Sequence, residues 1–336
     1  MGNATKRTAK IAIQVLFAGV FLYLAFRHLG WERARAVLGT THLSTLTLGL
    51  FLLAAGFAIR IMRWWEVLRL FNDDLRGTEC AGPFLASLAV NNVIPLRAGD
   101  ALRTFGFQER LDVKPTRVLG SMVIERLLDL LVLLVFLIAG LWMAPTAQVP
   151  RSLLLTIWGG GGLAATALLA LVLVPMQLKR LTDWILELSF LCGYSWTGAV
   201  KRWSSEFWES ILVLQRPVLT LRLLALSVGA WALEGGAFWA TAISINLGVS
   251  WEAALLALAS GTLATLLPST PGYAGTFDYF TMLAMKLHGV TQSTAAVYTL
   301  LIHLLLWAPV TAVGFSYLLV TQGREAVNQA RAGATQ

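Results

Sequence analysis

One apolar run in this chain is interrupted by proline and glycine, and this interruption constrains the fold more than any other feature. The run over residues 82–90 is too short to cross a bilayer. Pro95 ends it as a helix, because proline lacks the backbone donor and its ring clashes with the preceding turn. Gly99 allows backbone angles that other residues resist, and Asp100 is a typical N-cap for a second helix. We therefore predict a broken helix that descends, turns between Pro95 and Gly99, and returns.

The predicted turn is positively charged. Arg97 and Arg103 lie on either side of the start of the second helix. Irregular backbone at membrane depth occurs only where protein or a water-filled cavity satisfies its polar groups. Guanidinium groups beside a helix N-terminus are well suited to bind an anion, above all a phosphate. The sequence therefore predicts an anion site in this turn, to which Asn91, Asn92 and Asp100 also belong.

The composition places the rest of the chain in a membrane. Of 336 residues, 57% are hydrophobic and only 13% are charged, about half the charged share of a soluble domain. We expect no sizeable soluble domain and no nucleic-acid partner. The two cysteines, Cys80 and Cys192, have no metal-ligand spacing, so we expect no metal site and no cofactor.

The apolar runs predict an all-α polytopic membrane protein with about six transmembrane helices. These are expected near residues 11–26, 46–70, 117–143, 153–174, 219–245 and 293–319. A second short apolar run, residues 251–267, leads into a turn and then a short helix to about residue 287. The residues expected to form this second turn are Pro268, Pro271, Gly272 and Gly275. Residues 177–216 carry apolar side chains at helical spacing among charges, which predicts amphipathic helices on the membrane surface.

The two halves of the chain share one order of elements, a long helix, a broken helix and a long helix. Pro95 and Gly99 have the same spacing as Pro268 and Gly272. Within a single membrane domain, residues 1–336, we predict an inverted repeat of residues 42–143 and 218–320, with surface helices over residues 176–217 between them. Both broken helices are expected to be re-entrant, about an in-plane two-fold axis. Transporters commonly place their substrate site at such a junction, near the bilayer midplane.

The distribution of basic residues predicts the orientation. With the N- and C-termini in the cytoplasm, 20 of the 26 lysine and arginine residues lie on the cytoplasmic side and 5 lie outside. Cytoplasmic loops of membrane proteins carry this excess. The first broken helix is then expected to open to the cytoplasm and the second to the outside.

Charged residues inside the predicted spans are expected to have partners, because an unpaired charge in a bilayer is costly. Glu125 and Asp129 lie four residues apart and share a helix face, with Arg126 beside it. They form either structural ion pairs with Arg97 or Arg103, or a gate that releases these arginines when lipid arrives.

Other polar residues have simpler expected roles. Glu234 is expected to line the cavity, and Arg60 and Arg63 are expected to snorkel to the interface rather than bind substrate. Asp278 is expected to cap the helix that follows Gly275. His303 is expected to pack against Trp307, four residues further along its helix, as an aromatic pair.

The order and spacing of these motifs resemble the lysylphosphatidylglycerol synthase transmembrane family over about residues 11–320. The family pattern N-x-x-P-x-R-x-G-[DE]-x-x-R is met by Asn92, Pro95, Arg97, Gly99, Asp100 and Arg103. Its E-R-x-x-D pattern is met by Glu125, Arg126 and Asp129, and its second turn by Pro271, Gly272 and Gly275, which Thr276 follows. The resemblance implies a flippase-like integral protein of a bacterial or archaeal cytoplasmic (inner) membrane. The family's aminoacyl-transfer domain is not in this sequence, so aminoacylation is not expected.

We therefore expect a lipid flippase, scramblase or transporter, not an enzyme, that moves an anionic phospholipid or a polyprenyl-phosphate-linked lipid between leaflets. The expected substrate-binding residues are Asn91, Asn92, Arg97, Asp100, Arg103, Glu125, Arg126, Asp129, Glu234, Thr276 and Asp278. Two alternatives stay open, a membrane-embedded enzyme acting on a lipid-linked substrate and an accessory subunit that docks through residues 177–216. Besides the anionic lipid, a second copy of the chain or a membrane enzyme is an expected partner.

Overall fold

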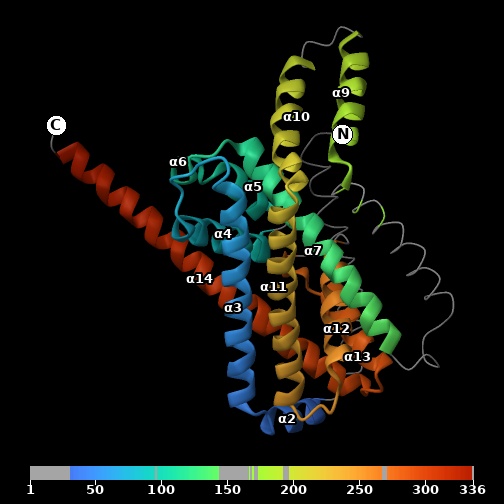
Figure 1. Cartoon of the computed structure of the whole chain (residues 1–336). Helices are drawn as coiled ribbons and strands as arrows, with labels where there is room; N and C mark the ends of the chain where they lie inside the picture. The colour runs from blue at the N-terminus through green and yellow to red at the C-terminus, as the bar shows by residue number, and fades with distance from the viewer. Residues whose placement is uncertain are drawn as a thin grey trace, which may run out of the picture.

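The computed structural model of the chain describes residues 31–94, 97–143, 166, 169, 173–191, 197–266 and 271–334 (Figure 1). These residues form helices and no strand, as predicted for an all-α protein. Among them, three helical stretches are long and apolar enough to cross a membrane, namely α3 (Leu43–Leu68), α11 (Pro217–Ser244) and the Gln292–Thr321 part of α14 (Gln292–Ala334). A short helix, α2 (Trp31–Gly39), precedes α3. The helix predicted over residues 11–26 and nearly all of the one predicted over 153–174 lie outside the described residues.

Helices α3 and α11 lie side by side at the centre of the molecule (Figure 1). Glycines of α3 allow this close approach. A Cβ atom added at Gly49 would lie 3.4 Å from the Ala237 carbonyl oxygen, and one added at Gly56 would lie 3.2 Å from that of Ala230. Small residues at helix contacts are typical of proteins in lipid, where backbone packing replaces the hydrophobic drive.

The first predicted broken helix is present as α4 (Gly77–Val93) and α5 (Ala98–Phe105), which pack against each other. A short α6 (Gln108–Leu111) then leads to α7 (Pro115–Met143). Helix α4 ends two residues before Pro95, consistent with proline's bias against helix at the preceding residue. Pro95 itself lies outside the described residues, as does Pro268.

The prediction that Asp100 is the N-cap of α5 is wrong. Arg97 occupies the N-cap position, with left-handed angles of φ 55° and ψ 42°, and Asp100 lies in the first helical turn. The cap comes from α4, because Asn91 Oδ1 accepts a hydrogen bond from the Gly99 backbone N–H at 2.8 Å. Asn91 Nδ2 in turn donates to Asp100 Oδ1 at 2.8 Å. One asparagine therefore joins both arms of the hairpin.

The second broken helix is present as α12 (Trp251–Ala264), the 3-10 turn η3 (Pro271–Tyr273) and α13 (Thr276–Leu287). Asp278 caps α13 as predicted, since its Oδ2 accepts from the Gly275 backbone N–H at 2.8 Å. Helix α14 begins as predicted and continues beyond residue 319, through the segment expected to be a polar tail, to Ala334.

Two helices occupy the predicted amphipathic segment, α9 (Pro175–Leu191) and α10 (Thr197–Ile211), followed by η2 (Leu212–Gln215). They project beyond the end of α11 (Figure 1). Helix α10 is tied to the start of α7 by Glu206, which accepts hydrogen bonds from Lys114 Nζ at 2.8 Å and from Thr116 Oγ1 at 2.5 Å. These two hydrogen bonds lower the pKa of Glu206 below its ordinary value.

Gly99 is the position where the first hairpin is most tightly packed. A Cβ atom added there would overlap the Ser87 backbone carbonyl of α4. We predict that Gly99→Ala lowers the free energy of unfolding by about 1–3 kcal/mol or more, because overpacking forces backbone to move. Thermal unfolding of the purified protein in detergent measures this. Gly248→Ala is the matched control, since nothing lies within 4 Å of that Cβ position. Equal melting temperatures for the two variants would contradict this packing.

Candidate functional site

A cavity of about 200 Å³ lies where the two turns meet. Seven of the eleven predicted site residues line it: Asn91, Asn92, Arg97, Glu125, Arg126, Asp129 and Glu234. Four others, Asp100, Arg103, Thr276 and Asp278, are not among its lining residues. Side chains that the prediction did not include complete the walls, among them Arg60, Trp231, Tyr273, His303 and Trp307. Seven predicted residues therefore converge on one cavity, although they come from three helices, α4, α7 and α11, and from the first turn.

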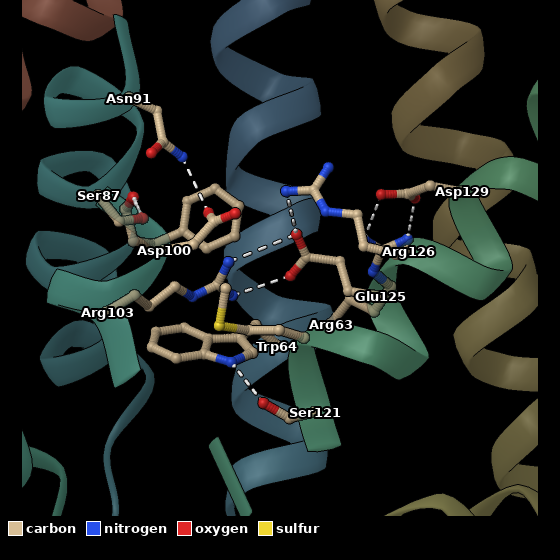
Figure 2. Close-up of polar contacts among 12 residues, drawn as sticks. Arg63, Trp64, Ser87, Asn91, Asp100, Arg103, Ser121, Glu125, Arg126 and Asp129 are labelled. Atoms are coloured by element: carbon tan, nitrogen blue, oxygen red, sulfur yellow. Dashed lines mark hydrogen bonds and ion pairs between the residues drawn. The ribbon is translucent and has the colours of Figure 1, made fainter. Parts of the chain in front are cut away.

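Arg103 is held by three side chains and faces Glu125 of α7 (Figure 2). Its Nη2 donates to Glu125 Oε2 at 2.8 Å, and its Nη1 lies 3.4 Å from Oε1. The guanidinium carbon also lies 3.8 Å from the centroid of the Trp64 ring and 4.4 Å from that of Phe84, both cation–π contacts. Only 1% of Arg103 is exposed. The prediction that Arg103 binds phosphate directly is therefore corrected, because its guanidinium is buried and already bound.

Asp129 has a different partner from the one predicted. Its carboxylate accepts from Arg63 at 2.5 and 3.2 Å and from Trp231 Nε1 at 2.9 Å. Arg63 Nη1 also lies 2.5 Å from Ser227 Oγ of α11. Asp129 therefore joins α7 to α3 and α11, and its ion-pair partner is Arg63 rather than Arg97 or Arg103.

Glu234 lines the cavity as predicted, and it is paired with Arg60. Arg60 Nη2 lies 2.6 Å from Glu234 Oε2, and its guanidinium carbon lies 4.1 Å from the Trp231 ring centroid. Arg60 and Arg63 are 7% and 2% exposed, so the prediction that they snorkel to the interface is wrong. The sequence held a signal for this pairing, because one predicted span carries two arginines about one turn apart and two other predicted spans carry acids that need a counter-charge.

Arg126 and Arg97 differ from Arg60, Arg63 and Arg103, because neither has an acid that pairs with it alone. Arg126 Nη2 lies 3.8 Å from Glu125, which Arg103 already binds more closely, and the Arg126 side chain is 43% exposed. Arg97 is exposed and lines the cavity. Within the described part of the chain, Arg97 has no acidic group within ion-pair distance. Each of the three acids that line the cavity thus has one close arginine partner, which leaves two further positive charges at the cavity.

Helix α14 holds both turns through residues spaced four apart. His303 Nε2 lies 2.9 Å from the Gly272 carbonyl oxygen and its Nδ1 lies 2.7 Å from Asp278 Oδ1. Trp307 Nε1 donates to the Asn92 carbonyl oxygen at 3.3 Å, and Asn92 Nδ2 donates to Thr311 Oγ1 at 2.9 Å. His303 therefore anchors the second turn rather than pairing with Trp307 as expected, and its ring packs on Phe277 instead.

In the described ranges, no cluster of three or more histidine, cysteine or acidic side chains is arranged to hold a metal ion. The chemistry that the cavity offers is recognition of charge by guanidinium groups, with aromatic and amide groups around them.

The Arg63–Asp129 pair is predicted to contribute strongly to stability. Asp129→Ala should lower the free energy of unfolding by about 3–5 kcal/mol, because it leaves a buried arginine without its counter-charge. The double variant Arg63→Met/Asp129→Leu should recover much of this loss. The free energy of unfolding of both variants is measured in mixed micelles that contain an increasing share of a denaturing detergent.

Asp183→Ala is the control, because Asp183 pairs with Lys179 on the surface of α9 and both side chains are partly exposed. Its expected cost is about 0.3–0.5 kcal/mol. If the two aspartate variants lost equal stability, the Arg63–Asp129 pair would not be a principal contact between α3 and α7.

Comparisons with known proteins find relatives among membrane proteins. The family model described as "Lysylphosphatidylglycerol synthase TM region" matches residues 11–314. Two similar proteins from Methanocaldococcus jannaschii are named UPF0104 membrane protein MJ1078 and UPF0104 membrane protein MJ1595. The first is 22% identical, over 67% of this chain and 91% of the relative. The second is 20% identical, over 94% of this chain and 96% of the relative.

A third relative is named glycosyltransferase AglD, from Haloferax volcanii. It is 25% identical over 88% of this chain but only 52% of its own length, so this chain spans about half of that protein. The family match covers both turns and nearly all of the cavity-lining helices, and the chain therefore belongs to the lysylphosphatidylglycerol synthase transmembrane-region family.

Proposed function

We propose that this protein moves an anionic lipid between the leaflets of a membrane and binds the lipid phosphate with Arg97 and Arg126. The observation that carries this proposal is the excess of positive charge at the cavity. Glu125, Asp129 and Glu234 each have a close arginine partner. Of the two other arginines at the cavity, Arg126 shares Glu125 with Arg103 at the longer distance of 3.8 Å, and Arg97 has no acid within ion-pair distance among the described residues. A guanidinium can donate hydrogen bonds to two phosphate oxygens at once, which neutralises charge and also fixes the orientation of the phosphate.

The walls of the cavity also suit a lipid. Apolar side chains line the same cavity as the two arginines, among them Phe57 of α3, Leu88 of α4 and Val310 of α14. A second cavity, about 300 Å³ in volume, lies between α7, α12 and α13 and is lined almost entirely by apolar side chains. Consecutive residues of α12 reach both cavities, Thr262 the first and Leu263 the second. A ligand with a charged head and a hydrocarbon tail matches this arrangement.

The two hairpins, α4–α5 and α12–α13, are proposed to be re-entrant and to enter from opposite sides of a cytoplasmic membrane, with both termini in the cytoplasm. Their turns lie against each other, since a Cβ atom added at Gly272 would lie 3.2 Å from the Asn92 carbonyl oxygen. Transporters built from inverted repeats bind substrate at such a junction and expose it alternately by rocking one half against the other. The inverted repeat of residues 42–143 and 218–320 is part of this proposal.

Transport is favoured over catalysis by the state of the acids that line the cavity. General acid–base catalysis requires a carboxyl group that can exchange a proton with substrate. Glu125, Asp129 and Glu234 are each held in an ion pair with an arginine. The similarity to the relative named glycosyltransferase AglD supports a second candidate, a membrane domain that presents a lipid-linked substrate to an enzyme. A change in the mass of the labelled lipid during transport assays would favour an enzymatic role.

The arginine pair can be tested in liposomes that contain the purified protein and a fluorescent anionic phospholipid. Arg97→Ala and Arg126→Ala should each lower the initial transport rate by about tenfold to a hundredfold, the range expected for losing a hydrogen bond to a charged group. Arg97→Lys should also impair transport, because lysine binds phosphate as a point charge. Quenching of the outer-leaflet label by dithionite reports the rate.

Arg202→Ala is the control for loss of a positive charge, because Arg202 is exposed on α10 and does not line the cavity. It should transport at the wild-type rate. Wild-type rates in both Arg97→Ala and Arg126→Ala would refute the proposed phosphate site.

The proposed orientation of the hairpins can be tested with single cysteines in a Cys80→Ser/Cys192→Ser background. Glu109→Cys, near the base of the first hairpin, should react with a membrane-impermeant maleimide only from the cytoplasmic side. Gly248→Cys, before the second hairpin, should react only from the outside. Both positions are exposed in the folded chain. Labelling of both from one side would contradict the inverted repeat.

A further inference from the structure

The second turn places a tyrosine where the backbone favours glycine. Tyr273 has φ 61°, and Arg97 in the first turn has φ 55°. Among the described residues, two other non-glycine residues have positive φ, Asp112 and Asn246, and their residue types adopt this conformation readily. Arginine and tyrosine do not, so each turn holds one strained residue. Backbone strain of this kind is typical of binding sites, and both strained residues line the same cavity.

The closure of the second turn does not depend on the Tyr273 side chain. His303 Nε2 lies 2.9 Å from the Gly272 carbonyl oxygen, and the Thr276 hydroxyl donates to the Tyr273 carbonyl oxygen at 3.3 Å. Asp278 caps the helix that follows. Glycine at position 273 would satisfy the same backbone contacts without strain. The Tyr273 ring packs against the main hydrophobic core, but this packing does not require its hydroxyl group.

The surroundings of the Tyr273 side chain supply a reason for the hydroxyl group. Tyr273 lines the cavity together with Arg97 and Arg126. Guanidinium groups only donate hydrogen bonds and carry the charge, whereas a phenol is a neutral, directional donor. An anion held by the two arginines would meet this donor on the side of the second turn.

We propose that the Tyr273 hydroxyl is a third ligand of the substrate phosphate and donates one hydrogen bond to the anion held by Arg97 and Arg126. This inference rests on the proposed function and assigns a role to the second turn. The first turn supplies Arg97, α7 supplies Arg126 and the second turn supplies Tyr273. The anion site is then complete only while the two turns face each other, so binding of the phosphate stabilises their contact.

The test measures binding of dihexanoyl phosphatidic acid to the full-length protein in detergent by isothermal titration calorimetry. Tyr273→Phe keeps the ring and removes only the hydroxyl. We expect the dissociation constant to rise about tenfold or more, as for a lost hydrogen bond to a charged group, with an unchanged melting temperature. Tyr279→Phe is the matched control, because Tyr279 does not line the cavity. It should bind like the wild type.

The arginine variants separate this inference from the proposed function. If Arg97→Ala and Arg126→Ala lose binding while Tyr273→Phe binds like the wild type, the role of Tyr273 is overturned and the phosphate site stands. If the wild type does not bind dihexanoyl phosphatidic acid, both the phosphate site and the role of Tyr273 are overturned. Titration with inorganic phosphate identifies the source of the anion. If inorganic phosphate binds much more weakly than dihexanoyl phosphatidic acid, the ligand is a lipid head group. If the two bind equally, the site takes a free anion, and the lipid is overturned as its ligand.

Discussion

The ion pair between Arg103 and Glu125 fixes the first hairpin to the rest of the molecule. Arg103 comes from the short returning helix α5, which would otherwise be held mainly by α4, and Glu125 comes from the long helix α7. Because both groups are almost fully buried, their charges stabilise the fold only as a pair with good hydrogen-bond geometry. The aromatic rings of Trp64 and Phe84 close the remaining faces of the guanidinium. Through this pair, the turn that carries Arg97 is held against the cavity.

The same constraint explains the composition of the cavity. Every buried acid in this region requires a cation, and the structure supplies Arg103 for Glu125, Arg63 for Asp129 and Arg60 for Glu234. These three ion pairs join α3, α5, α7 and α11 and neutralise the three carboxylates. Arg97 and Arg126 are left over, and they are the two positive charges that the proposed anion binding uses. Structural pairing and the proposed binding therefore use different arginines.

Helix α14 gives the two turns a common support. His303 contacts the second turn, and Trp307 and Thr311 contact the first, all on one face of this helix. A movement of α14 relative to either hairpin would break contacts to one turn and keep those to the other. In the proposed transport cycle, a movement of one turn is transmitted to the other turn through its contacts with α14.

Residue type and spacing alone predicted an all-helical membrane protein, the two turns and seven of the residues that line the cavity. Pro95, Gly99 and the short apolar runs act through local backbone chemistry, and the capping of α13 by Asp278 is equally local. The pairing of charges was different. Arg103 was expected to bind phosphate and Arg60 and Arg63 to face the interface, but each is buried against an acid from another helix. Asp100 was expected to cap α5, but Asn91 caps it from the opposite arm of the hairpin. The sequence by itself determined which groups must be neutralised at membrane depth, whereas the tertiary structure alone decided which arginine meets which acid, because that choice depends on how separate helices face one another in space.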